Sequence, residues 1–305
     1  MIVASKKFSI LITTKNRIND LKFTLFKIQY LLDRNDVECL ICDDGSTDGT
    51  FKYIQDNFSK IQLIQNPANK GLIFSRNRLL NMVNSEYSII IDDDAHFLSQ
   101  NNLENIEDYF SKNTQCAVLG FRIFWGLVEP VQTFSCELPH RMKSFVGCAH
   151  VWRMSAWREV PNYPEWFIFY GEEDFASYQL FKKNWEIHYL PEVFVHHRVD
   201  IKARKNNADY SLRLRRSLRS GWYLFFMFCP IKKIPRKMAY SLYTQFKLKV
   251  FKGDWKALQA IVFALLDLVC NILKIRKNSN RLTTEEYVAL NKLPETKLYW
   301  ISQTD

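Results

Sequence analysis

The stretch "SIIIDDDAHF", Ser88 to Phe97, places three carboxylates directly after three isoleucines. A run of isoleucines is typical of a strand buried inside a sheet. Adjacent carboxylates repel one another, and burying any of them is costly unless it is paired or bound to a metal. The pattern therefore predicts a buried strand that ends, at Asp92, Asp93 and Asp94, in a site for a positively charged group.

The chain before this strand alternates between short apolar runs and stretches with helical spacing of apolar residues. Strands are predicted in 8–14, 37–47, 61–66 and 86–94, and helices in 19–32, 48–58 and 71–83. This alternation predicts an α/β fold with a mostly parallel central sheet flanked by helices. Three strands end in polar residues, "TTKNR", "CDDGS" and "DDDA", which we expect to meet in one crevice at the carboxyl ends of the strands.

The C-terminal third has a different character. From Arg198 to Lys252 there are fifteen Lys or Arg residues against two acids, in a chain of 305 residues with a net charge of +10. We expect a catalytic domain in residues 1–200, with a nucleotide-binding half to about 97 and an acceptor half from about 98. A basic, amphipathic, helical extension in residues 201–305 is expected to follow it.

The strongest helix of this extension is predicted in "DWKALQAIVFALLDLVCNILKIRK". Gln259, Asp267 and Asn271 recur on it at helical spacing. An Asp near the centre of a membrane-spanning helix costs about 2.5–3.5 kcal/mol. We therefore expect this helix to lie on a membrane or to pack on the domain rather than to span a bilayer.

The seven cysteines are odd in number, and most of them stand in apolar runs. They are interpreted as buried thiols of a reducing compartment. The N-terminal residues lack the layout of a signal peptide. Both features predict a cytoplasmic protein.

The motifs exclude two common nucleotide sites, since the sequence has neither GxGxxG nor GxxxxGK[ST]. Asp92 and Asp94 instead form a DxD at a strand end. Oxygen ligands of this kind suit Mg²⁺ or Mn²⁺, which often keep a substrate diphosphate among their ligands. Arg76 and Arg78, near the start of a predicted helix, suit the recognition of that diphosphate.

In order and spacing, "SILITTKNR", "ICDDGSTDGT", "NPANKGLIFSRNRLL" and "EYSIIIDDDA" resemble the family-2 inverting glycosyltransferases of the GT-A fold. The resemblance covers about Phe8 to His197. It implies base contacts for Thr13 and Asp44, with Lys15 standing where the family has an aromatic residue. It also implies Arg76 near the diphosphate, Asp92 near the ribose and Asp94 on the metal, Mn²⁺ or Mg²⁺. Arg17, Gly71 and Asp93 complete the predicted nucleotide-sugar set, although strand alternation turns Asp93 away from the ligand.

Two further motifs of the family have an ambiguous register here. The catalytic base lies in "YGEEDF", where a local match selects Asp174 and counting back from "YQLFKKN" selects Glu173. The strand "VFVHHR" resembles the strand whose histidine completes the metal site. His196 is the preferred match and His197 the alternative.

The basic tail resembles, more loosely, bacterial glycosyltransferases of surface-polysaccharide assembly. The expected function is metal-dependent, inverting transfer of a sugar from a UDP- or dTDP-sugar, with UDP favoured, to a glycan or lipid-diphosphate-linked acceptor. The expected location is peripheral, on the inner face of the cell membrane, held through the basic helices to anionic lipid, and no nucleic-acid partner is expected. The alternatives are a nucleotidyltransferase or phosphatase that uses the acidic strand ends, and a non-catalytic membrane adaptor.

Overall fold

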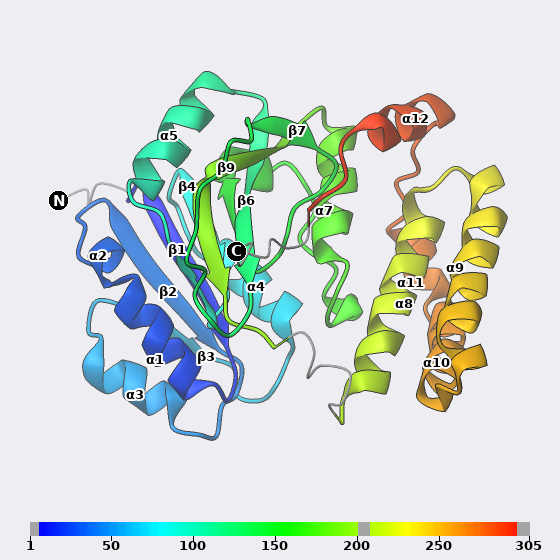
Figure 1. Cartoon of the computed structure of the whole chain (residues 1–305), viewed down its shortest axis with the longest axis horizontal. Coiled ribbons are helices and arrows are strands. Elements are labelled where there is room, and N and C mark those ends of the chain that lie inside the picture. Colours follow the sequence, from blue (N-terminus) through cyan, green and yellow to red (C-terminus); the bar gives the residue numbers. More distant parts are fainter. Residues whose placement is uncertain (1–5, 201–207, 298–305) are drawn as a thin grey trace.

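The computed structural model describes residues 6–200 and 208–297 (Figure 1). Within them, one sheet has the strand order β3-β2-β1-β4-β8-β6-β9-β5, with β7 beside β9. The strands are β1 (Phe8–Thr14), β2 (Val37–Asp43), β3 (Gln62–Gln65), β4 (Tyr87–Ile91), β5 (Ala95–Phe97), β6 (Cys116–Trp125), β7 (His140–Met142), β8 (Ala149–Arg153) and β9 (Glu186–His197).

The first four strands form the parallel half of the sheet, because β1 pairs in parallel with both β2 and β4, and β2 with β3. β1 occupies the predicted residues. Its Ile10 and Ile12 belong to one core cluster and its Leu11 to another, as expected for a strand with both faces covered. The carboxyl ends of these strands therefore lie at one edge.

The second half of the sheet is mixed. β8 runs antiparallel to both β4 and β6, while β6 and β9 are parallel to each other. The prediction of a mostly parallel sheet thus describes the N-terminal half, and the antiparallel β8 separates the two parallel parts. The predicted strand 86–94 ends at Ile91, because Ala95 N donates to Asp92 O at 3.0 Å and turns the acids out of the strand.

Helices cover both faces of the sheet (Figure 1). α1, α2, α3 and α5 contribute to the core on one face, and α4, α6 and α7 to the core on the other. In the part of the chain that the structure describes, the α-helices are α1 (Ile18–Lys27), α2 (Gln29–Leu32), α3 (Thr50–Asn57), α4 (Leu72–Leu80), α5 (Asn102–Lys112), α6 (Met154–Trp157), α7 (Glu172–Lys182), α8 (Tyr210–Phe228), α9 (Ile234–Leu248), α10 (Trp255–Cys270), α11 (Ile272–Lys277) and α12 (Thr284–Lys292).

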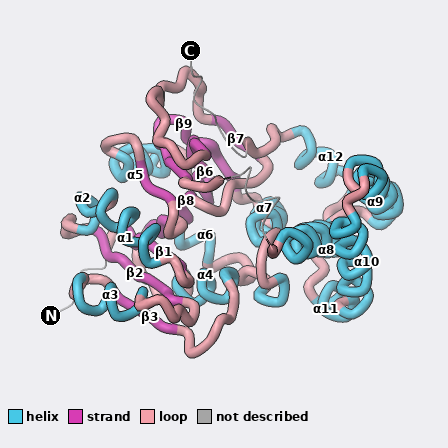
Figure 2. Tube along the Cα trace, turned by 60° about the horizontal axis from the view of Figure 1, so that its bottom comes forward, coloured by secondary structure: helices cyan, strands magenta, loops and turns pink. Residues whose placement is uncertain are grey.

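The C-terminal helices pack on the domain that contains the sheet. α7 lies between the sheet and α8 (Figure 2). Trp222 of α8, Ile261 of α10 and Ile275 of α11 belong to the same buried cluster as Trp152 of β8. The predicted boundary between residues 200 and 201 borders residues 201–207, which lie outside the described residues. Among the helices that are described, none combines the length and apolar character needed to cross a membrane.

The polar stripe predicted on α10 is directed at α8. Asp267 accepts hydrogen bonds from Arg215 Nε at 2.7 Å and Nη2 at 2.6 Å, and Asn271 Nδ2 donates to Tyr223 Oη at 3.0 Å. The polar stripe therefore packs against α8. The opposite face of α10 does not carry these polar residues.

The cysteines are all free, and five of them are buried. Cys136 and Cys270 are exposed, so the prediction of buried thiols is wrong for these two. Cys270 is the last residue of α10 and lies on the outer side of that helix.

Candidate active site

The three polar strand ends meet at one edge of the sheet. Thr14 Oγ1 donates to Asp93 Oδ2 at 2.8 Å, and Asp44 N donates to Thr14 O at 2.9 Å. This convergence follows from the parallel pairing of β1, β2 and β4. The predicted crevice is confirmed.

A cleft of about 400 Å³, here called the strand-end cleft, opens at this edge. Its size is in the usual range of ligand pockets. Every residue predicted to bind the nucleotide-sugar except Arg76 lines it: Thr13, Lys15, Arg17, Asp44, Gly71, Asp92 and Asp93, together with the predicted metal ligand Asp94.

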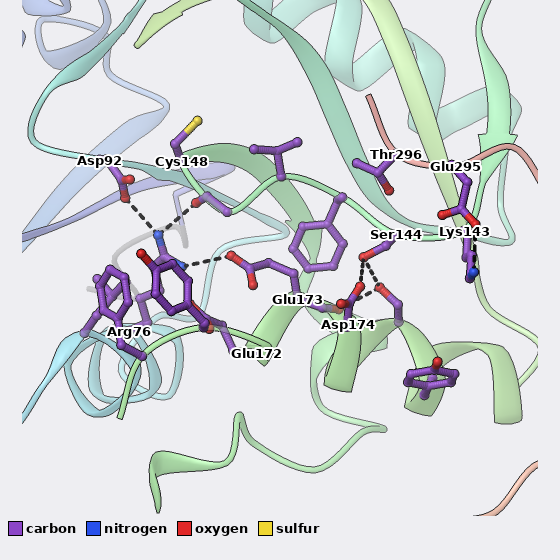
Figure 3. Close-up of a pocket in the computed structure, with 18 of the residues that line it drawn as sticks. Arg76, Asp92, Lys143, Ser144, Cys148, Glu172, Glu173, Asp174, Glu295 and Thr296 are labelled. Carbon is purple, nitrogen blue, oxygen red and sulfur yellow. Dashed lines mark hydrogen bonds and ion pairs between the residues drawn. The ribbon is translucent and has the colours of Figure 1, made fainter. Parts of the chain in front are cut away.

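A second cleft of about 740 Å³, here called the helix cleft, runs between α7, α8 and the loop before β8 (Figure 3). Arg76, Glu173 and Asp174 line it. The two clefts share Asp92 and His197 in their walls. A ligand in one cleft can therefore meet a ligand in the other beside these two side chains.

The three acids of the opening triplet have different partners. Asp92 accepts from Arg76 Nη2 at 2.8 Å, and Asp93 accepts from Thr14. Asp94 accepts from Arg17 Nη2 at 2.7 Å, and Arg17 also forms an ion pair with Asp93 at 3.0 Å. Burial raises the pKa of Asp93 to about 7, against the lowering effect of Arg17. The structural role expected for Asp93 agrees with these contacts.

Asp92, Asp94 and His197 offer three ligand atoms within 4.8 Å of one another. His197 Nε2 lies 3.0 Å from Asp94 Oδ1. Two carboxylate oxygens and one imidazole nitrogen suit Mn²⁺ or Mg²⁺. Arg17 pairs with Oδ2 of the buried Asp94, while Oδ1, on the side of His197, accepts no hydrogen bond from the described residues and is free to coordinate a cation. These residues fit the implied metal.

His196, the preferred histidine, faces away from Asp94. Its Nε2 donates to Gly126 O at 2.8 Å, whereas His197 turns to the carboxylate. Neighbouring residues of a strand point to opposite faces, so only one of the two can reach the site. The preference for His196 is thus wrong in placement, and the alternative, His197, lies with Asp94.

His196 instead joins His96 and Glu129 in a second group of three ligand atoms within 4.8 Å. Arg198 Nη1 lies 2.7 Å from His96 Nδ1 and can only donate. The neutral His96 ring therefore carries its proton on Nε2, the atom that would face a metal. This group does not match a metal site.

Arg76 is buried among carboxylates rather than open to a ligand. Its Nη2 donates to Asp92 Oδ1 and to Gly147 O, both at 2.8 Å, and its Nη1 donates to Glu172 Oε1 at 3.0 Å (Figure 3). Glu173 Oε1 lies 3.7 Å from the same Nη1. Arg76 therefore links the end of β4 to the start of α7.

Glu173 and Asp174 point to different parts of the helix cleft (Figure 3). Glu173 lies with Arg76, while Asp174 Oδ1 accepts from Ser144 Oγ at 2.8 Å. Burial and the neighbouring Glu172 raise the pKa of Glu173 well above its usual range. Consecutive helix residues diverge by about 100°, which accounts for the separation. The alternative, Glu173, is the acid on the side of Asp92, and the preferred Asp174 is turned from it.

Asp44, which is predicted to contact the base, holds the 66–71 loop at the strand-end cleft. Its Oδ1 accepts from Lys70 N at 2.8 Å and from Asn66 Nδ2 at 2.8 Å, and its Oδ2 accepts from Gly71 N at 2.9 Å. Gly71 has φ +98°, a left-handed conformation that glycine adopts without strain. Asp44 thus anchors the 66–71 loop, and its contact with a base stays a prediction.

Sequence reasoning missed Arg213 and Arg216 of α8, which line the strand-end cleft. It also missed Gly147, where a Cβ would lie 1.8 Å from Glu173 Oε1. Ile168 and Tyr170, in the loop before α7, have φ of 69° and 71°. Such values are strained for a β-branched or bulky residue and cluster at functional sites. None of these features has a local sequence signal, because each depends on segments distant in the chain.

Residues 9–177, more than half of the chain, match the profile of "Glycosyl transferase family 2". The chain belongs to this family and is a glycosyltransferase. No curated protein is similar enough in sequence to be matched.

Solved structures with the same fold include three glycosyltransferases. GalNAc-T7 with UDP, GalNAc and Mn²⁺ has a TM-score of 0.58 and 14% identity, over 74% of this chain and 48% of that one. The mannosyltransferase PcManGT of Pyrobaculum calidifontis, with GDP-Man and Mn²⁺, has a TM-score of 0.56 and 13% identity, over 95% and 80%. TarS 1–349 of S. aureus, with UDP-GlcNAc, has a TM-score of 0.57 and 16% identity, over 90% and 84%. The chain thus spans about half the length of GalNAc-T7, and these likenesses show the GT-A fold.

Proposed function

We propose that this glycosyltransferase moves a sugar, with inversion, from a nucleoside diphosphate sugar to a hydroxyl of a glycan or lipid-linked acceptor, and that it needs Mn²⁺ or Mg²⁺. The observation that carries the proposal is the position of Asp92, Asp94 and His197. The three side chains surround one point at the junction of the two clefts. A donor in the strand-end cleft and an acceptor in the helix cleft would meet there.

The metal would be held by Asp94 and His197, with Asp92 on its open side. Asp92 is the most exposed of the three, with 25% of its side chain accessible, against 3% and 6% for the other two. When bound, the ion supplies positive charge that offsets the charge of a leaving diphosphate. Arg17 and Arg76 hold the carboxylates of this group in place.

Glu173 is the general base of the proposed reaction, with Asp174 as the alternative. Glu173 takes the proton of the acceptor hydroxyl, and the oxygen attacks the anomeric carbon on the face opposite the diphosphate. The new bond forms as the bond to the diphosphate oxygen breaks, so the configuration inverts. The position of Glu173 near Arg76, which also contacts Asp92, supports this assignment.

The donor proposed is a UDP- or dTDP-sugar, and UDP is favoured. Two of the similar solved structures contain UDP or UDP-GlcNAc and one contains GDP-Man. The experiment is a transfer assay with UDP-, dTDP- and GDP-sugars and a panel of glycan and lipid-diphosphate acceptors, with Mn²⁺ or with chelator. Metal-dependent release of the nucleoside diphosphate is expected from the wild type and not from Asp94→Ala. Full activity of Asp94→Ala with chelator would contradict the proposal.

The proposed location is the inner face of the cell membrane. α10 and α11 expose seven large apolar side chains: Trp255, Val262, Phe263, Leu266, Val269, Ile272 and Leu273. Three lysines are also exposed on these helices: Lys256 on α10, and Lys274 and Lys277 on α11. Apolar side chains beside cations are the arrangement of helices that lie in the headgroup region of anionic membranes.

Sedimentation with lipid vesicles tests this location. The wild type is expected to sediment with vesicles that contain an anionic lipid and less with purely zwitterionic ones. Leu266→Glu is expected to remain in the supernatant, while Val288→Glu, an exposed apolar site on α12, serves as the matched control. Equal sedimentation of the wild type and Leu266→Glu would contradict it.

A further inference from the structure

α8 presents two arginines to the strand-end cleft. Arg213 and Arg216 both line it, as do Asp92 and Asp94. They are three residues apart on a helix, so they lie on one face. α8 follows the segment that matches the family, which ends at residue 177.

The four arginines of this part of α8 differ in their partners. Arg215 and Arg219 form ion pairs with Asp267 of α10, at 2.6 Å and 3.4 Å. Arg213 forms an ion pair with Asp209. Within residues 6–200 and 208–297, no hydrogen bond or ion pair of the Arg216 side chain is found. Of the four arginines, Arg216 is therefore the one whose charge can pair with a ligand without breaking an ion pair within the described residues.

The surroundings of Arg216 make an unpaired guanidinium costly. The side chain is half-buried, and burial together with the charges of Arg219 and Arg213 lowers its pKa. A buried charge without a partner costs free energy unless an opposite charge binds there. An anion bound in the strand-end cleft would supply the opposite charge that the Arg216 side chain lacks.

The helix is fixed against the strained loop at the cleft. Arg219 Nη2 donates to Phe167 O at 2.6 Å. A Cβ on Gly171 would lie 3.0 Å from Ser220 Cβ, which shows how closely the loop and α8 approach. Phe169 of the same loop lines both clefts. Arg216 is therefore presented from a rigid element, which lowers the entropy lost when it binds an anion.

We infer that Arg216, assisted by Arg213, binds the diphosphate of the nucleotide donor from the side opposite the metal-binding carboxylates. The inference rests on the proposed function and adds a second, cationic wall to its donor site. Arginine matches phosphate oxygens with two parallel hydrogen bonds. It also offsets the negative charge of the diphosphate as it leaves, so the C-terminal part of the chain contributes directly to the active site.

The test measures binding of UDP, dTDP, GDP and inorganic diphosphate, each with Mn²⁺, by calorimetry. Arg216→Gln is expected to bind the diphosphate probes about tenfold or more weakly than the wild type. Arg216→Lys, which keeps the charge but not the paired hydrogen bonds, is expected to fall between them. Arg158→Gln removes one exposed positive charge that lines neither cleft and is expected to match the wild type. Thermal melting confirms that each variant is folded.

The outcomes separate this inference from the function on which it rests. If the wild type binds a nucleoside diphosphate and folded Arg216→Gln binds it equally well, the role of Arg216 is refuted and the proposed function stands. If the wild type binds none of the four probes, the proposed donor site itself is refuted, and the inference with it. A loss in Arg216→Gln with partial recovery in Arg216→Lys supports both.

Discussion

At the scale of single residues, the choice of base is the sharpest claim. Glu173→Gln is expected to lower the turnover number by about 10²- to 10⁴-fold, the usual contribution of a general base. Asp174→Asn is expected to keep most of the turnover, because Asp174 accepts a hydrogen bond from Ser144 on the other side of the helix cleft. Initial rates of nucleoside diphosphate release, with thermal melting of both variants, measure this. If Asp174→Asn lost more turnover than Glu173→Gln, Asp174 rather than Glu173 would be the general base.

The pH dependence of the reaction follows from the environment of Glu173. Burial and the adjacent Glu172 raise the pKa of Glu173, so its protonated form persists to a higher pH than in water. A protonated carboxyl cannot accept the acceptor's proton, and activity should therefore fall as the pH drops through this raised value. The acid limb of kcat/KM is expected above about 4.3, the ordinary pKa of a Glu side chain.

A pH–rate profile at saturating Mn²⁺ measures this limb. The residual activity of Glu173→Gln should lack it, since that variant has no carboxyl to titrate at this position. A limb near the ordinary value, or one that persists in Glu173→Gln, would assign the titration to another group.

The sequence was least informative where it had to choose between two adjacent residues. The motifs selected an acid pair, Glu173 and Asp174, and a histidine pair, His196 and His197, but could not choose within either pair. The choice between His196 and His197 depends on the face that each shows, which is set by the pairing of β9 with β5 and β6. A shift of one residue would exchange them.

At the scale of elements, the site depends on the contact between the loop before β8 and the start of α7. Gly147 O accepts from Arg76, and the absent side chain of Gly147 leaves room for Glu173. This close approach requires glycine for steric reasons. The loop thereby sets the direction in which Glu173 points.

Gly147→Ala tests this contact. Its Cβ would lie 1.8 Å from Glu173 Oε1, so the Glu173 side chain must move. Because a displaced catalytic group is poorly aligned, turnover is expected to fall about tenfold or more, with little change in the melting temperature. The matched control is Gly221→Ala on α8, where a Cβ meets nothing within 4 Å. Wild-type turnover in Gly147→Ala would show that the contact does not position Glu173.

Elements were the part of the fold best predicted from the sequence. β1, at residues 8–14, was found at its predicted bounds, because a continuous apolar run bounded by polar turns has few alternatives. The stretch from 115 to 151 is apolar enough to supply further strands but has no clear period, so it predicts neither the bounds of β8 nor its antiparallel direction. Its pairing is determined by long-range contacts with β4 and β6.

At the scale of the whole molecule, the residues that line the strand-end cleft come from the N-terminal half of the sheet, from β9 and from α8. β1, β2 and β4 supply its acidic wall, β9 supplies His197, and α8 supplies the arginines that face them. The sequence predicted the first contribution through motifs. It attributed the arginines to a membrane-binding tail, because only the folded chain brings α8 to the strand ends. The C-terminal helices share one buried core with the sheet, which packs α8 against the catalytic half of the molecule.

The central claim is that Asp92, Asp94 and His197 bind the divalent cation that anchors the donor diphosphate. Calorimetric titration of UDP, with and without Mn²⁺, into the wild type, His197→Ala and His196→Ala tests it most directly. UDP binding is expected to require Mn²⁺ in the wild type and in His196→Ala, and to be lost or weakened at least about tenfold in His197→Ala. Mn²⁺-dependent binding that survives in folded His197→Ala but is lost in His196→Ala would contradict the account.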